Sequence, residues 1–242
     1  MNVWVLTALV IEGMAAAGVT AVWRTGRTAP AFFLGFNTML PVTLIFVLSF
    51  PPVGVRHGLV LAMVVLYLAH LNWLLLFHHR KTALNKLNTR LPARQKIFLP
   101  FVLTNTAGWA YCLPFYFAVR RTAPLGAADL LAVTLYLAGT AVHFGSDLQK
   151  VRFKSRPENQ HKLLMEGFWS WCRHPNYFGD FLIYVSFALI GGSLWAWVAP
   201  VLNAAQYLFD AIPKNERWAA EHYGPAWEAY ARRTKRFIPG VL

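Results

Sequence analysis

A cluster of polar side chains stands directly in front of an apolar run of the sequence, in "SWCRHPNYFGD" (170–180). Its proline suits the first turn of a helix, where the missing N–H group costs nothing. Arg173 and Tyr177 are then one helical turn apart, as are Asn176 and Asp180, so each pair lies on one face. A helix start presents unpaired N–H groups and the positive end of its dipole. The spacing therefore predicts a site for an anionic ligand.

A second set of polar residues recurs at helical spacing in a later apolar segment. Asn203, Gln206 and Asp210 stand at i, i+3 and i+7, which places them on one side of a helix. Hydrogen bonds between neighbouring helices explain such a stripe as well as a ligand does. Asp180, inside its own apolar run, is costly against lipid and should face the protein interior or a wet cavity. Together these residues predict a polar half-cavity.

Three side chains in the first half of the sequence could supply a proton in apolar surroundings. Glu12 lies midway along the first apolar segment, where an ionised carboxylate is expensive and a neutral, proton-donating carboxyl is expected. His70, with Tyr67 one helical turn earlier, could act as its partner or substitute. The alternatives are a carboxyl that hydrogen-bonds to a neighbouring helix and a purely structural histidine. We treat Glu12, Tyr67 and His70 as candidate catalytic residues.

The elements that hold these residues are apolar enough for a membrane. Of the 242 residues, 57% are hydrophobic and 14% are charged, whereas charged residues make up about a quarter of an ordinary soluble domain. A bilayer is spanned by about 20 apolar residues, and we expect seven spans, near 3–23, 30–50, 58–77, 98–118, 124–145, 176–191 and 194–211. Gly191-Gly192-Ser193 divides the last two. The predicted fold is an all-α integral membrane protein, a bundle of about seven transmembrane helices.

The positive charges gather on one side of this predicted bundle. The net charge is +13, and with the N-terminus outside, 20 of the 23 Lys and Arg residues fall on the inner side. This asymmetry follows the positive-inside rule, and an even number of spans would break it. The cations are thus explained by the membrane, and nucleic acid is not an expected partner. We expect a cytoplasmic C-terminus, in a bacterial inner membrane or the endoplasmic reticulum.

The remaining features indicate one membrane domain. No internal repeat or long linker divides the chain. Residues 1–23 lack a cationic start and a cleavage site, so we interpret them as a retained span. Cys112 and Cys172 would lie on opposite membrane faces. They form no disulfide framework and match no metal spacing, and we expect no metal site.

The last 30 residues, 213–242, have the pattern of short helices at the membrane surface. Tyr223-Gly224-Pro225 indicates a helix stop followed by a new start. Trp218, Trp227 and Tyr230 alternate with charged residues, and aromatic side chains of this kind anchor helices at the headgroup level. We therefore expect short interfacial helices at the C-terminus.

Three blocks of the second half carry a resemblance to a known family. "QKVRFKSRP" (149–157), "GFWSWCRHPNYFGD" (167–180) and "ERWAAEHYGPAWEAYARRTKRFIPG" (216–240) resemble the C-terminal half of the membrane reductase superfamily of sterol C14 and C7 reductases and steroid 5α-reductases. The blocks follow the family's order over about the last 100 residues. The short RHP-x-Y motif alone is also similar to one in membrane methyltransferases.

The resemblance implies that the half-cavity holds NADPH. By position it assigns cofactor contacts to Asp147, Lys150, Lys154, Asn176, Tyr177, Asp180, Glu216 and Tyr223. The same motifs and the polar stripe add Arg173, His174, Asn203, Gln206, Asp210 and Arg217. Lys and Arg side chains suit the phosphates of such a cofactor. Residues 121–242 would then form the cofactor half and residues 1–120 the substrate half.

The function that this resemblance implies is the saturation of an activated C=C bond. Hydride from the nicotinamide would reach the β carbon, while a hydrogen-bond donor on the substrate carbonyl takes up the developing charge. The substrate would be a lipophilic steroid, sterol or isoprenoid-like molecule, and no obligate protein partner is inferred. Two alternatives stay open: a methyltransferase of the isoprenylcysteine or phospholipid type that uses S-adenosylmethionine, and a membrane adaptor whose basic loops bind anionic lipid.

Overall fold

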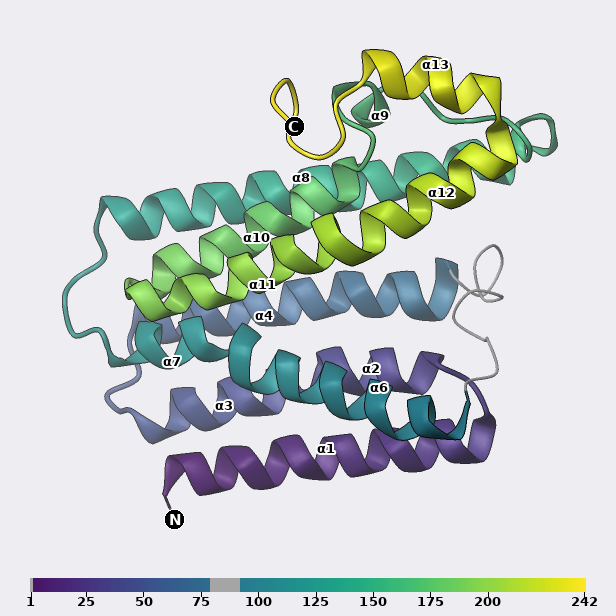
Figure 1. Ribbon diagram of the computed structural model, residues 1–242. Helices are drawn as coiled ribbons and strands as arrows, with labels where there is room; N and C mark the ends of the chain where they lie inside the picture. Colours follow the sequence, from purple (N-terminus) through teal and green to yellow (C-terminus); the bar gives the residue numbers. More distant parts are fainter. Residues whose placement is uncertain (1, 79–91) are drawn as a thin grey trace. The chain divides into compact units, whose positions relative to one another are not determined.

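The computed structural model describes residues 2–78 and 92–242, and helices with their connections account for all of these residues without a β-strand (Figure 1). Much of the basic segment between 78 and 96 lies outside the described residues. The longer helices, in chain order, are α1 (Val3–Thr25), α2 (Ala29–Asn37), α3 (Met39–Ser49), α4 (Val55–Trp73), α6 (Ala93–Asn105), α7 (Leu113–Arg120), α8 (Ala127–Ser155), α10 (Pro175–Gly191), α11 (Val198–Gln206), α12 (Ile212–Tyr223) and α13 (Pro225–Arg233). Shorter ones are η1 (Leu74–His78), η2 (Thr106–Tyr111), η3 (Pro157–Asn159), α9 (Phe168–Trp171), η4 (Leu194–Trp197) and η5 (Tyr207–Ala211).

The all-helical fold class is confirmed, but the count of seven spans is not. Among the described residues, four helical stretches are long and apolar enough to cross a membrane: Val3–Thr25, Ala29–Ser49, Val55–Leu76 and Ala127–Ser155. The other expected spans are helical but divided into shorter pieces or, like α10, fall short in length. The number of transmembrane spans therefore depends on how these shorter helices lie in the bilayer.

Proline and glycine explain the breaks. In the segment 98–118, Pro100 lies inside α6, and the wider turns of η2 follow before α7 begins. The expected turn at Gly191-Gly192-Ser193 is confirmed, since α10 ends at Gly191 and Gly192 has a φ of 64°. The Ser193 side chain then accepts a hydrogen bond from the Trp195 amide and caps η4.

The chain forms two compact units. One comprises residues 1–128 and 187–199, and the other comprises 129–186 and 200–242. In the first unit α1, α2 and α6 contact one another, and α3 and α4 pack together beside α7 (Figure 1). In the second unit α8, the first part of α10, and the helices from α11 to α13 carry most of the polar candidates.

The three cations expected outside are structural parts of the first unit. Arg56 is buried and donates hydrogen bonds to the carbonyls of Arg121, Ala123 and Pro124 at 2.9–3.2 Å. Arg121 donates to the Ile190 carbonyl at 2.9 Å. Arg120 is exposed and donates to the Tyr116 hydroxyl. These bonds satisfy carbonyls that no helix pairs, which explains why these cations stand apart from the others.

Replacing Arg56 with methionine is expected to destabilise the protein by about 2 kcal/mol, because three carbonyls lose a charged donor in a buried position. The matched control is Arg120→Met, which removes an exposed cation from the same region and should cost less than about 1 kcal/mol. Chemical denaturation in detergent measures both values. Equal effects would contradict the role given to Arg56.

In the second unit α8 and α10 cross at two glycines. A methyl group added at Gly179 would touch the backbone of His143 and lie 2.7 Å from the carbonyl oxygen of Gly139. Such distances leave no room for a side chain, so the two backbones are in direct contact. Asp180 is the next residue of α10, and this close crossing brings its carboxylate to α8.

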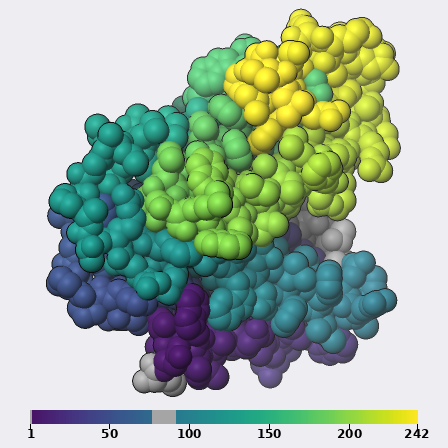
Figure 2. All heavy atoms as spheres, turned by 60° about the vertical axis from the view of Figure 1, so that its left-hand side comes forward, coloured from purple at the N-terminus to yellow at the C-terminus, as the bar shows by residue number. Residues whose placement is uncertain are grey.

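The C-terminal segment packs onto the second unit. The expected stop at Tyr223-Gly224-Pro225 is confirmed: α12 ends at Tyr223, Gly224 has a φ of 51°, and Pro225 begins α13. Of the three aromatic side chains expected to anchor this segment in the headgroup layer, Trp218 is exposed, whereas Trp227 and Tyr230 are buried in a cluster with Ala219 and pack on protein. Their rings attach α13 to the protein, and the tail forms one continuous yellow surface beside α12 (Figure 2).

Candidate functional site

One face of α8 carries four polar residues in a row. His143, Asp147, Lys150 and Lys154 follow one another at spacings of four, three and four, which keeps them on one side of the helix. The sequence analysis identified the last three of them. It missed His143, although its distance of one turn from Asp147 was the available signal.

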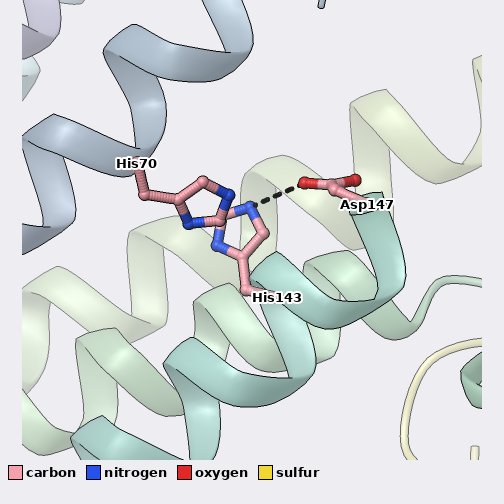
Figure 3. Close-up of side chains that lie close together, drawn as sticks. All are labelled: His70, His143 and Asp147. Atoms are coloured by element: carbon pink, nitrogen blue, oxygen red, sulfur yellow. Dashed lines mark ion pairs between the residues drawn. The ribbon is translucent and has the colours of Figure 1, made fainter. Parts of the chain in front are cut away.

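A histidine between two buried carboxylates forms the centre of the site. His143 Nε2 lies 3.4 Å from Asp147 Oδ2, and the two side chains come from successive turns of α8 (Figure 3). His143 Nδ1 lies 3.5 Å from Asp180 Oδ1 on α10. Asp180 is 3% exposed. Two carboxylates at this depth need an intervening donor, and the imidazole ring is placed to be that donor.

Amide and hydroxyl groups bind the remaining carboxylate oxygens. Asn176 Nδ2 donates to Asp147 Oδ1 at 3.1 Å. Asn203 Nδ2 and the Tyr207 hydroxyl donate to Asp180 Oδ2 at 2.9 Å and 2.6 Å. The structure thus brings four predicted cofactor residues into one buried polar cluster, which we call the aspartate cluster: Asp147, Asn176, Asp180 and Asn203, with His143 and Tyr207 added.

Part of the polar stripe 203/206/210 does not face this cluster. Asn203 is buried in it, whereas Gln206 and Asp210 are exposed and Asp210 forms an ion pair with Lys214. Gln206 ends α11 on its exposed side, and η5, a π-helical turn over Tyr207–Ala211, rotates Asp210 relative to an α-helix. Tyr207 takes the inward position instead, one turn after Asn203.

A stack of three rings adjoins the aspartate cluster. The Tyr177 ring lies parallel to the His174 ring, with centroids 5.4 Å apart, and parallel to the Tyr207 ring at 4.3 Å. Asn215 Nδ2 donates to the Tyr177 hydroxyl at 2.7 Å. In place of the expected pairing with Tyr177, Arg173 makes other bonds, and the Tyr177 ring is held in the stack with His174 and Tyr207.

Arg173 holds the C-terminal segment. Its Nε donates to Glu216 Oε1 at 2.8 Å, and its Nη1 donates to the carbonyls of Ala231 and Thr234 at 2.9 Å and 2.6 Å. Arg236 Nε lies 3.3 Å from Glu216 Oε2. The Arg173 guanidinium and the Glu216 carboxylate therefore both bind groups of the protein, although the resemblance assigned Glu216 to the cofactor.

These contacts set the charge of Glu216 and His174. Burial alone would raise the pKa of Glu216, but His174, 3.4 Å away, and Arg173 outweigh it and lower the pKa to about 2. The pKa of His174 lies below its ordinary value, because burial disfavours the charged ring more strongly than Glu216 favours it. At neutral pH the segment therefore has a charged Glu216 beside a neutral His174.

Acid should weaken the fold in two steps. His174 has a lowered pKa, so its contribution is present above its ordinary pKa of 6.5 and is lost as the pH falls below that value. Glu216 contributes fully above 4.5 and loses its contribution as the pH falls from 4.5 towards 2. We expect the free energy of unfolding to follow both steps, and Glu216→Gln to remove the second one. Glu228→Gln, at an exposed carboxylate that pairs with Arg232, should leave the profile unchanged.

The two lysines of α8 contact aromatic side chains and a loop. Lys150 Nζ lies 4.9 Å above the Trp169 ring. Lys154 Nζ donates to the Tyr223 hydroxyl at 3.1 Å and to carbonyls of the loop after η3, those of Asn159, Gln160 and Lys162. Lys154 and Tyr223, both assigned by the resemblance, thus lie together. Arg217 is exposed on α12.

A cavity of about 710 Å³ lies next to the Lys154–Tyr223 pair. Its wall includes the cations Lys162 and Arg233 and the rings of His161, His222 and Tyr223. A volume of this size suits a drug-sized or nucleotide-sized ligand. Cations with aromatic rings are groups that bind phosphates and bases.

The candidate catalytic residues lie in the first unit and differ in exposure. Tyr67 and His70 are buried on α4, with Tyr67 edge-on to the Phe187 ring at 5.9 Å. Glu12 lies on the exposed side of α1. The structure therefore keeps Tyr67 and His70 one turn apart in the interior and does not bring Glu12 there.

Comparisons with known proteins place these residues in a family context. The family described as a protein of unknown function (DUF1295) matches residues 25–234, which include every candidate of the second unit. A Delta(14)-sterol reductase of Ascobolus immersus is 28% identical over 160 residues, 60% of this chain and 36% of that protein. A Delta(14)-sterol reductase of Mus musculus is 28% identical over 151 residues, 55% and 36% respectively.

A relative of another kind is also similar. Protein-S-isoprenylcysteine O-methyltransferase of Schizosaccharomyces pombe is 24% identical over 131 residues, 54% of each chain. The chain spans little more than a third of the length of the two sterol reductases. The similarity therefore concerns a part of those proteins.

Proposed function

Since the chain belongs to the DUF1295 family and to the membrane superfamily of sterol reductases and steroid 5α-reductases, we propose that it is an NADPH-dependent reductase of the membrane. Its reaction is the saturation of an activated C=C bond in a lipophilic substrate of the steroid, sterol or isoprenoid-like class. The observation that carries this proposal is the aspartate cluster, which lies where the sequence resembles the reductases.

The residues of the second unit suit a dinucleotide. Asn203 Oδ1 is buried and accepts no hydrogen bond from a described residue, so it can accept one from a cofactor hydroxyl or amide. Lys162 and Arg233, in the wall of the cavity beside Lys154 and Tyr223, supply positive charge for phosphates.

Each part of the chain has a task in this reaction. When bound, NADPH supplies the hydride. The aspartate cluster orients the polar groups of the bound cofactor, since the carboxylates of Asp147 and Asp180 are each fixed by two or more donors. Of the three predicted proton donors we favour Tyr67 and His70, because they are buried, and a donor shielded from water stabilises developing charge most strongly. Glu12, exposed on α1, is the third.

The competing function is methyl transfer from S-adenosylmethionine, which the isoprenylcysteine methyltransferase relative supports. That cofactor carries no phosphate and offers the cationic wall near Tyr223 a single carboxylate, whereas NADPH offers several phosphate charges. A membrane adaptor is the third candidate, and it gives no purpose to the buried carboxylates.

A thermal-stability experiment separates these functions. A ligand that binds only the folded state raises the unfolding temperature by mass action. We expect NADPH to give a larger shift with detergent-purified protein than NADH, and S-adenosylmethionine to give none. Membranes incubated with NADPH and a panel of enones should then show a product two hydrogens heavier by mass spectrometry. A shift with S-adenosylmethionine alone would support methyl transfer, and no shift with any of these would support the adaptor.

A further inference from the structure

The face of α8 opposite the aspartate cluster borders a second cavity. This cavity has a volume of about 580 Å³; Gly145, Gln149 and Arg152 line it along α8, and Arg156 lines it just after the helix ends at Ser155. The three helical residues are offset by two positions from His143, Asp147 and Lys150, which places them on the opposite side of the helix. The cavity therefore lies on the other side of α8 from the aspartate cluster, and its wall shares Phe153 and Glu166 with the cavity beside Lys154 and Tyr223.

The far wall of this cavity is apolar and aromatic. The Phe168 ring packs against Gly145, where an added methyl group would lie 2.8 Å from it. The Trp171 ring lies edge-on to Phe168 with centroids 4.9 Å apart, and Trp171 is 50% exposed. Leu148 and Leu164 complete the apolar lining. Such a surface suits a hydrocarbon chain.

Gln149 holds this wall in place. Its Oε1 accepts a hydrogen bond from the Phe168 amide at 3.1 Å, and its Nε2 donates to the Glu166 carbonyl at 2.9 Å. Gly167, between them, has a φ of 61° and leaves no space for a side chain beside Gln149. The connection from Glu166 to Phe168 is thus fixed to α8, and the cavity is a formed feature of the fold.

The polar wall consists of two arginines that the protein does not use. Neither Arg152 nor Arg156 forms a side-chain hydrogen bond or ion pair with a residue that the structure describes, and both are exposed. Lys154, between them in sequence, binds three carbonyls and a hydroxyl. Glu166 also lines the cavity, so the three charged side chains leave it with one net positive charge, which matches a single negative charge.

The position of the cavity identifies the kind of ligand. Arg152 lies in the last turn of Ala127–Ser155, a helix long and apolar enough to cross a membrane, and Arg156 follows that helix directly. The end of such a helix lies at the level of the lipid headgroups. We propose that this cavity binds an anionic phospholipid, with its phosphodiester on Arg152 and Arg156 and an acyl chain along Phe168 and Trp171.

Phosphatidylglycerol, phosphatidylcholine and glycerol phosphate test this site on the detergent-purified full chain. We expect phosphatidylglycerol to raise the unfolding temperature and to remain bound in native mass spectrometry. Phosphatidylcholine lacks the net charge, and glycerol phosphate lacks the acyl chain, so neither should do so. The double variant Arg152→Gln/Arg156→Gln should lower phosphatidylglycerol affinity about 30-fold, since each cation near an anionic lipid is worth about fivefold.

The control is Arg24→Gln/Arg27→Gln, which removes two exposed cations in and just after the last turn of another candidate span and should leave the affinity unchanged. The arginine variants should also bind NADPH like the unchanged protein, because neither Arg152 nor Arg156 lines the cavity beside Lys154 and Tyr223. Three results would overturn the proposal: equal binding of phosphatidylglycerol by the double variant, an equal shift with phosphatidylcholine, or an equal shift with glycerol phosphate, which would indicate a free-anion site.

Discussion

Asp180→Asn is expected to lower NADPH affinity about a hundredfold and to destabilise the protein by about 3 kcal/mol. The carboxylate of Asp180 is buried and accepts hydrogen bonds from Asn203 and Tyr207, while its other oxygen faces His143. Asparagine has one acceptor oxygen in place of two. Its NH₂ group would therefore face donors on one side and leave them without an acceptor. Donors that lose their acceptor in a buried position cost more than an average hydrogen bond contributes.

Asp210→Asn is the matched control for this substitution. It makes the same chemical change on a carboxylate that is exposed and paired only with Lys214, and it should leave both quantities within experimental error. Titration with NADPH followed by intrinsic fluorescence gives the affinity, and denaturant unfolding gives the stability. If the two variants behave alike, the aspartate cluster does not bind the cofactor; loss of stability without loss of affinity would assign it a structural role only.

The membership of the aspartate cluster could largely be predicted from sequence, but its bonds could not. The spacing of Asn176 and Asp180 suggested that the two act as a pair on one helix. In the structure Asn176 binds Asp147 on α8 and Asp180 binds Asn203 on α11, because both of these helices lie against α10 here. Periodicity reports which residues share a face of one helix. It contains no information on which helix is opposite.

Irregular helical turns limited the prediction further. The stripe 203/206/210 assumed 3.6 residues per turn, and η5 breaks that assumption between Asn203 and Asp210. Tyr207 was missed although it lies one regular helical turn after Asn203. By contrast, the turns at Gly192 and Gly224 followed from local chemistry, since glycine alone adopts positive φ readily. Trp227 and Tyr230 were misplaced because an amphipathic helix packs equally well on lipid and on protein.

Gly179→Ala is expected to destabilise the protein by about 3 kcal/mol and to abolish the reductase activity proposed here. The added methyl group would meet the carbonyl oxygen of Gly139 and the Cα atom of His143, at 2.7 Å and 2.8 Å. These are backbone atoms of α8, which cannot rotate away as a side chain could, so the two helices must separate. Separation moves Asp180 away from His143, and their distance of 3.5 Å is lost together with the packing.

Gly58→Ala provides the opposite control, because no atom of a neighbouring described element lies within 4 Å of a methyl group added at Gly58 on α4. Alanine is the better helix former, so this variant should gain up to about 1 kcal/mol. Denaturant unfolding gives the free energy of unfolding of both variants and of a third, Gly179→Ser. Serine is slightly larger than alanine, so if the loss comes from packing, Gly179→Ser must be destabilised at least as much as Gly179→Ala. If Gly179→Ala is as stable as Gly58→Ala, then α8 and α10 do not touch at Gly179. That result would also contradict the arrangement in which Asp147 and Asp180 are buried on either side of His143.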